Sequence, residues 1–153
     1  MKAAIGLLIM ITTLVSCVAK TEGDVPKKPL TGTWQLLTGT LIEKGDTVVT
    51  DYSKNKSFIK IINDTHFAFL QHDLSKGKDS AAAVFSAGGG SYTLVDSLYT
   101  EHLEYCNDRA WEGNDFTFTI VIKKDTLIQS GAEKVESSGV NRLNIEKYYR
   151  LKK

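Results

Sequence analysis

The sequence contains little cysteine and little proline, with two residues of each among 153. Two cysteines are too few for the disulfide framework that holds many small secreted domains together. The chain also has almost no excess charge, because 19 Lys and Arg residues stand against 18 Asp and Glu residues. Binding to nucleic acid needs clustered Lys and Arg, whereas here these residues are scattered through the expected turns. We therefore expect no nucleic-acid partner.

The apolar run near the N-terminus is too short to cross a membrane. Residues 3–15 (AAIGLLIMITTLV) number 13, whereas a membrane-spanning helix needs about 20 apolar residues. Lys2 precedes the run, so the pattern predicts a signal peptide. The next residues, 14–17 (LVSC), resemble a bacterial lipobox, in which the cysteine receives lipid and the chain is cleaved before it. We expect residues 1–16 to be a lipoprotein signal peptide, with an ordinary secretory signal as the alternative.

The expected lipid on Cys17 defines the location of the protein. Several acyl chains, palmitate among them, would give stable anchoring, so the membrane is an expected partner. Val18 is not Asp, and the retention rule that keeps some lipoproteins in the inner membrane does not apply. We expect a cell-envelope lipoprotein of the outer membrane that faces either the periplasm or the cell surface. Residues 17–29, with both prolines, predict a flexible tether behind the lipidated cysteine.

Lipidation of Cys17 would leave Cys106 as a lone thiol in an oxidising compartment. No second free cysteine exists and no histidine adjoins it. A small buried apolar side chain on a strand is therefore the favoured interpretation over a reactive or metal-binding thiol.

From Leu30 onward the pattern is that of an all-β protein. Short segments rich in Thr, Ile, Val, Phe and Tyr alternate with clusters of Gly, Asn, Asp and Lys. Turn signals about every 8–12 residues, without a helix of three turns, are typical of a sandwich or a barrel. We expect one domain over residues 30–153. Strands are expected near residues 32–42, 47–52, 57–63, 66–72, 82–87, 90–95, 98–106, 115–124, 126–131 and 144–152.

Period-two alternation assigns the faces of these strands. In residues 116–122 the even positions are Phe or Ile and the odd positions are Thr or Val, so the even positions should point inward. Phe67 and Phe69 follow the same rule. In residues 99–105 the odd positions carry Tyr, Glu, Leu and Tyr, which predicts that Glu101 and Tyr105 lie inside the domain.

Gly32 and Trp34 form a Gly-x-Trp element where the first strand should begin, and Arg150 lies on the last expected strand. This combination resembles the lipocalins, a calycin-type family in which an Arg of the last strand lies across the Trp and closes the barrel floor. A guanidinium can stack on an indole while donating to strand-end carbonyls. The resemblance implies a single antiparallel up-and-down β-barrel of about 8–10 strands.

A second resemblance covers nearly all of residues 30–152. The segments 65–69 (THFAF), 88–94 (GGGSYTL), 99–105 (YTEHLEY), 116–118 (FTF) and 129–131 (QSG) are similar to small lipocalin-like domains of bacterial lipoproteins. That family largely lacks an assigned activity, so the resemblance speaks to the fold.

Two functions of different class fit such a barrel. The first is a binding module for a small hydrophobic or amphipathic ligand. The second is a filled barrel that acts through its outer surface as a protein-interaction or inhibitor domain. By analogy with lipocalins we favour binding. The candidate ligand-binding residues are Phe67, Phe69, Tyr92, Tyr99, Glu101, Tyr105 and Phe118.

Glu101 is the one carboxylate expected among these aromatic side chains, and a buried charge needs a partner. It could receive a polar ligand group. Alternatively an internal partner satisfies it, and the candidates are Arg109, Arg142, Gln129 or a tyrosine hydroxyl.

No motif predicts catalysis, a metal or a cofactor. His102 and Glu104 would share one strand face, but no third ligand is tied to them by spacing. No Gly-x-Ser-x-Gly element is present, and nothing links a nucleophile to a histidine base. Gly88, Gly89 and Gly90 precede no helix, so they indicate a bulge or a sharp bend at a barrel corner. An enzyme is thus unsupported by the sequence.

Overall fold

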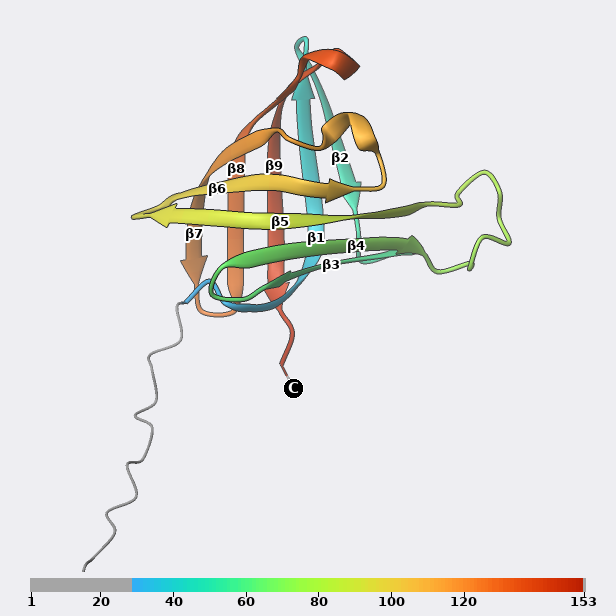
Figure 1. Cartoon of the computed structure of the whole chain (residues 1–153). Coiled ribbons are helices and arrows are strands. Elements are labelled where there is room, and N and C mark those ends of the chain that lie inside the picture. Colours follow the sequence, from blue (N-terminus) through green and yellow to red (C-terminus); the bar gives the residue numbers. More distant parts are fainter. Residues whose placement is uncertain (1–28, 153) are drawn as a thin grey trace, which may run out of the picture.

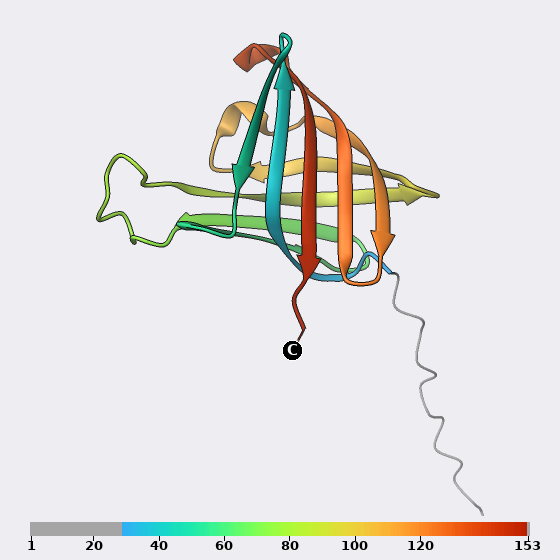
Figure 2. The same cartoon turned by 180° about the vertical axis from the view of Figure 1, so that it is seen from behind.

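The computed structural model describes residues 29–152, which form nine β-strands and two short 3₁₀ helices (Figures 1 and 2). The expected signal peptide, the lipidation at Cys17 and nearly all of the tether lie outside the described residues. The elements are β1 (Gly32–Glu43), β2 (Asp46–Asp51), β3 (Lys56–Ile62), β4 (His66–Asp73), β5 (Phe85–Val95), β6 (Leu98–Cys106), η1 (Arg109–Trp111), β7 (Asp115–Lys123), β8 (Thr126–Val135), η2 (Glu136–Ser138) and β9 (Val140–Arg150).

The strands form a closed antiparallel barrel. Neighbours in sequence pair from β3 to β9, and β9 then pairs along β1 to close the wall. β2 and β3 pair one after the other with the same edge of β1, as in Leu41 with Val48 and Gln35 with Ile59. Together they occupy one position, so the wall has eight strands. The expected all-β barrel is confirmed.

Alternation and tight turns explain why these segments form the wall. Along β7 the residues Phe116, Phe118 and Ile120 are buried while the Thr residues between them are exposed, as the sequence predicted. Hairpin turns place Lys44, Asp96 and Lys124 at positive φ between β1 and β2, β5 and β6, and β7 and β8. Local sequence therefore fixes most of the wall.

A β-bulge in β6 corrects one predicted face. Gly89 pairs with Tyr105 but Gly90 pairs with Leu103, so Glu104 is an extra residue in the strand. The bulge turns the following side chain round, and Tyr105 is 68% exposed. The prediction that Tyr105 points inward was therefore wrong. Glycine is needed opposite the bulge, because a Cβ at Gly90 would lie 2.0 Å from the carbonyl oxygen of His102.

The glycine run itself does not divide a strand. Sequence reasoning placed two strands at 82–87 and 90–95, whereas β5 is continuous through residues 88–90. The three glycines allow atoms of the neighbouring strands to approach β5 closely. The ring of Phe69, for example, lies over Gly88. A bulge is present at this point, but its extra residue lies in β6 opposite the glycines, and the break expected between the two strands is absent.

A second register shift lies in β1. Leu36 pairs with Tyr148 and Thr38 pairs with Lys147, so Leu37 is the extra residue. Trp34 and Leu36 are fully buried before the shift. After it, Gly39 and Leu41 line the barrel interior. Even-numbered residues therefore face the barrel interior before the shift, and odd-numbered residues face it after the shift.

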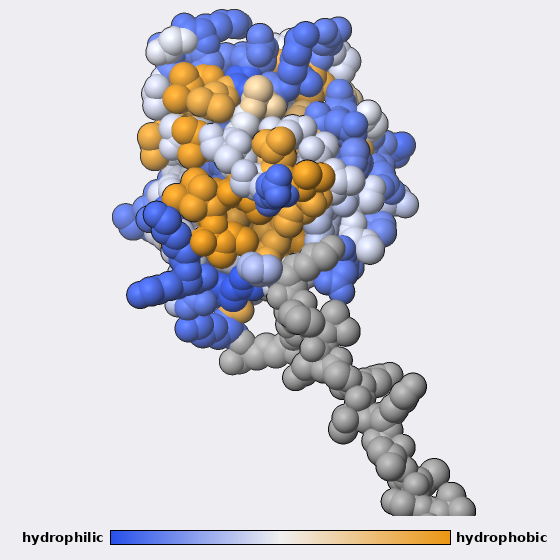
Figure 3. All heavy atoms as spheres, turned by 90° about the vertical axis from the view of Figure 1, so that its left-hand side faces the viewer, coloured by the Kyte–Doolittle hydropathy of each residue, from blue (hydrophilic) through white to orange (hydrophobic). Residues whose placement is uncertain are grey.

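The outer wall carries exposed apolar side chains. Val95 and Leu98 pair at the tip of the β5–β6 hairpin, and Val121 pairs with Ile128 across β7 and β8. All four are exposed, and apolar surface gathers on this side of the molecule (Figure 3). None of the helices in residues 29–152 is long and apolar enough to cross a membrane.

Candidate functional site

One end of the barrel is closed by Trp34 and Arg150, which stand opposite each other on β1 and β9. The guanidinium carbon lies 3.9 Å from the centre of the indole ring. The guanidinium donates to the carbonyl oxygens of Thr31, at 2.6 Å, and Pro29, and Trp34 Nε1 donates to that of Leu30 at 2.9 Å. The chain entering β1 is thus tied beneath the barrel.

Gly32 permits this closure. Its φ is +144°, a conformation that favours glycine, and a Cβ there would lie 2.6 Å from Arg150 Nη1. We call the assembly of Leu30, Gly32, Trp34 and Arg150 the floor.

Above the floor, one half of the barrel is filled by packed side chains. Tyr92 and Tyr99 pack with ring centroids 5.1 Å apart, and the Tyr92 hydroxyl donates to the carbonyl oxygen of Asn63 at 2.8 Å. The Tyr99 hydroxyl is buried and has no hydrogen-bond partner among residues 29–152. Burial and the nearby charge of Glu101 raise the pKa of Tyr99 far above its usual value. Phe67 and Leu127 complete this packing.

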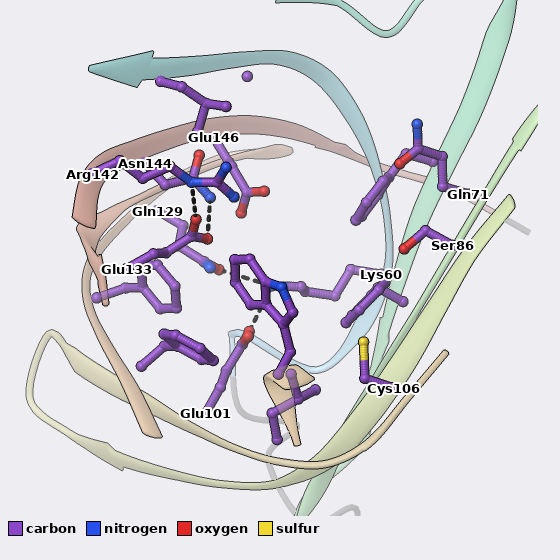
Figure 4. A pocket seen from close by; sticks show the side chains of 18 of the residues that line it. Lys60, Gln71, Ser86, Glu101, Cys106, Gln129, Glu133, Arg142, Asn144 and Glu146 are labelled. Carbon is purple, nitrogen blue, oxygen red and sulfur yellow. Dashed lines mark hydrogen bonds and ion pairs between the residues drawn. The ribbon is translucent and has the colours of Figure 1, made fainter. Parts of the chain in front are cut away.

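The other half of the barrel holds a cavity of about 290 Å³ that is partly open to solvent (Figure 4). Its lining includes Trp111 from η1 and Thr50 from β2. Its wall is apolar on one side, where the rings of Phe58 and Phe69 stack 5.8 Å apart. Tyr52 meets Phe58 edge-on at 5.9 Å. The cavity therefore combines a closed bottom with an aromatic wall.

The bottom of the cavity carries an ion pair. Lys60 Nζ lies 2.6 Å from Glu101 Oε1 and 3.2 Å from Gln129 Oε1. Both charged side chains are almost wholly buried, at 3% and 8% exposure. The ammonium also lies 5.5 Å from the ring centre of Tyr148. Burial raises the pKa of Glu101, and the charge of Lys60 opposes that rise.

Lys60 is the main partner of Glu101. Of the candidates predicted from the sequence, Gln129 contacts Lys60 and the hydroxyl of Tyr99 interacts with Glu101. Arg109 and Arg142 pair with other carboxylates. Sequence reasoning missed Lys60 as the partner. A signal was available, because Phe58, Lys60 and Ile62 alternate along β3 and share the inward face. When a lysine and a carboxylate both point into a barrel interior, they are expected to form an ion pair with each other.

A second polar group lies at the cavity wall nearer the rim. Glu133 accepts hydrogen bonds from Arg142 Nε and from Asn144 Nδ2, both at 2.7 Å. The guanidinium carbon of Arg142 lies 5.3 Å from the ring centre of Trp111. Trp111 in turn packs against Phe116 at 5.6 Å. This network ties η1 to the barrel wall.

Glu146 is the remaining charged group on β9 that faces the cavity (Figure 4). It accepts one hydrogen bond, from the Tyr148 hydroxyl at 2.8 Å. Among the described residues it forms no ion pair. Its charge contributes to the raised pKa of Tyr52, whose main cause is burial.

The predicted ligand residues divide into three groups. Phe69, Glu101 and Phe118 line the cavity. Phe67, Tyr92 and Tyr99 lie in the packed half and do not line it. Tyr105 points outward. The lining residues that sequence reasoning missed include Tyr52, Lys60, Trp111, Glu133 and Glu146.

Cys106 also lines the cavity, as a half-buried free thiol whose pKa is raised by burial. His102 lies on the outside, where its Nδ1 is 2.8 Å from Asp115 Oδ1. Glu104 instead accepts two hydrogen bonds from Ser91. No group of three or more potential metal ligands occurs within residues 29–152.

Comparisons with known proteins found no matching family model and no similar curated protein. Among solved structures, the chain is similar to an uncharacterized protein from Bacteroides eggerthii, at 12% identity and a TM-score of 0.49. The match covers 79% of this chain and 98% of that one. At this level of similarity nothing about ligand or activity follows from it.

Proposed function

We propose that the protein is a membrane-anchored, lipocalin-like binding module that holds a small amphipathic molecule in the barrel cavity. The observation that carries the proposal is the 290 Å³ cavity between the packed half and the rim. Ligand sites are typically concave, largely apolar and supplied with a few placed polar groups. The aromatic wall and the polar groups of Lys60, Glu101 and Glu146 fit that description.

The relation to lipocalins is part of the proposal. Its support is the closed eight-stranded wall and the contact of Arg150 with Trp34. A shared architecture is an analogy at the level of the fold, so it supports binding in general without naming a ligand.

The anchor rests on sequence alone. The charged Lys2, the apolar run at 3–15 and the LVSC element ending at Cys17 support lipidation and an envelope location, with the outer membrane favoured.

Native mass spectrometry of the protein purified from its own cells tests the binding function. We expect a co-purifying small molecule in the wild type. Thr50 lines the cavity, so Thr50→Trp should fill part of the cavity and abolish the adduct. Thr47 is exposed on the opposite face of the same strand, so Thr47→Trp should retain it.

An empty wild-type protein, combined with no difference between the two variants, would contradict binding. That outcome would favour the alternative of a barrel acting through its outer surface. The exposed apolar side chains Val95, Leu98, Val121 and Ile128 are the feature that supports this alternative.

A further inference from the structure

The cavity carries more negative than positive groups. Its lining includes two cationic side chains and four carboxylates, so its formal charge is −2. The cations are Lys60 and Arg142, and the carboxylates are those of Glu101, Glu133, Glu146 and Asp108.

Both cations already have partners. Lys60 is held by Glu101 at 2.6 Å, and Arg142 by Glu133 at 2.7 Å. An anionic ligand would therefore find no free cation, and its charge would add to that of the unmatched carboxylates. Like charges brought together in a partly desolvated site repel.

Asp108 and Glu146 are the carboxylates left without a cation in the lining. Asp108 is exposed at the rim, where it caps η1 by accepting from the Ala110 backbone amide. Glu146 is less exposed and lies deeper, on β9 between Gly39 of β1 and Gln129 of β8. Gly39 carries no side chain, and the ring of Tyr52 lies over it, since a Cβ at this position would be 3.1 Å from Tyr52 Cε2.

Two tyrosines lie near this carboxylate. Tyr148 donates its hydroxyl to Glu146 at 2.8 Å, and its ring lies 6.4 Å from that of Phe58. Tyr52 meets Phe58 edge-on, with ring centroids 5.9 Å apart. A carboxylate beside aromatic faces is a combination that recognises organic cations, through charge-assisted hydrogen bonds and cation–π attraction.

We propose that the cavity takes a small organic cation, a protonated amine on a short apolar body, with the ammonium at Glu146 and the apolar part along Phe58 and Phe69. This inference rests on the proposed binding function and specifies its ligand class. Lys60 and Glu101 then form a fixed base to the cavity, and the ligand supplies the positive charge that Glu146 lacks.

A matched set of probes tests the class of ligand. The probes are 4-phenylbutylamine, 4-phenylbutanol and 4-phenylbutyrate, which share one apolar body and differ in charge. Isothermal titration calorimetry with the wild-type protein should give the amine an affinity about tenfold or more above that of the alcohol. The butyrate should bind more weakly than the alcohol.

Glu146→Gln should remove the preference for the amine and leave the affinity for the alcohol within about twofold, since only the charge-assisted term is lost. Glu136→Gln is the control, because it removes the same charge from an exposed side chain paired with Lys134. It should leave all three affinities unchanged. Because Glu146 lacks a cation partner, Glu146→Gln should melt at or above the wild-type temperature, whereas a purely structural Glu146 would give a lower one.

The outcomes separate the two proposals. Equal binding of amine and alcohol by the wild type, or tightest binding of the butyrate, overturns the cation inference and leaves the binding function standing. Absence of binding by all three probes, together with an empty native protein, overturns both.

Discussion

Among single side chains, Lys60 has the most unusual position, since its ammonium lies inside the barrel with a carboxylate as its counter-charge. Removing one partner of a buried pair leaves the other charge desolvated, which typically costs more than the pair contributes. The ion pair also occupies the space beneath the cavity. Its loss should therefore affect folding and the shape of the cavity together.

We expect Lys60→Met to destabilise the protein by about 3–5 kcal/mol near neutral pH. Burial raises the pKa of Glu101 above 4.5, and removal of Lys60 removes the charge that opposes this rise. The stability associated with a raised carboxyl pKa is fully present below 4.5 and is lost as pH rises through the folded-state value. The penalty should therefore be larger at about pH 8 than at about pH 4.

Urea unfolding at the two pH values measures this difference. Lys147→Met is the control, because Lys147 is exposed on β9, and it should cost little at either pH. A penalty for Lys60→Met that is the same at both pH values would contradict a charged Glu101 as its origin.

At the level of elements, β1 and β9 carry both the closure of the wall and the floor beneath it. Trp34 packs against the entering chain on one side and Arg150 on the other. The indole is fully buried, whereas the guanidinium is partly exposed. The indole should therefore contribute more to the stability of the fold than the guanidinium, and the effect of removing one side chain should depend on whether the other is present.

We expect Trp34→Ala to cost about 3–5 kcal/mol, the usual range for loss of a buried large aromatic. Arg150→Ala should cost less. The double variant should be less destabilised than the sum of the two, because both substitutions remove the same contact. Chemical unfolding of the four proteins completes the cycle, and strictly additive costs would show that the stacking contributes nothing to the floor.

The strands also show which features of the fold could be predicted from the sequence. Alternation predicted the inward faces of β4 and β7 correctly, because a regular strand has a period of two. It failed at Tyr105, because the bulge at Glu104 depends on the close passage of Gly90 against the neighbouring strand. The glycine run indicated a bulge or a bend in this region, but nothing in the local sequence showed that the extra residue would lie in the partner strand.

The cavity was harder to anticipate than the wall. Glu101 could be placed inside the barrel from its strand, but its partner Lys60 lies 41 positions away in the chain. Whether a barrel interior is filled or hollow depends on side chains that converge from many strands. Trp111 enters the lining from a 3₁₀ helix outside the wall, where no strand periodicity applies.

At the scale of the whole molecule, the lipid anchor expected at Cys17 would hold the protein at the membrane. Cys17→Ser should abolish lipid attachment and leave the protein in the aqueous phase of a detergent partition. A chain with several acyl groups binds membranes stably, whereas a single acyl chain is marginal. Metabolic labelling with an alkyne fatty acid reports the modification. Cys106→Ser, which alters the cavity thiol, should label like the wild type, and a wild type without label would contradict the lipoprotein prediction.

The floor and the first described residues occupy the same end of the barrel, because Arg150 binds the carbonyl oxygens of Pro29 and Thr31 (Figure 1). Attachment through the flexible tether expected at residues 17–29 would therefore join the protein at its sealed end, and the mouth lies away from the point of attachment. Whenever the mouth faces away from the bilayer, a molecule dissolved in the lipid has no direct route into the cavity and first has to cross water. The rate of loading would then follow the free aqueous concentration of the ligand rather than its concentration in the membrane.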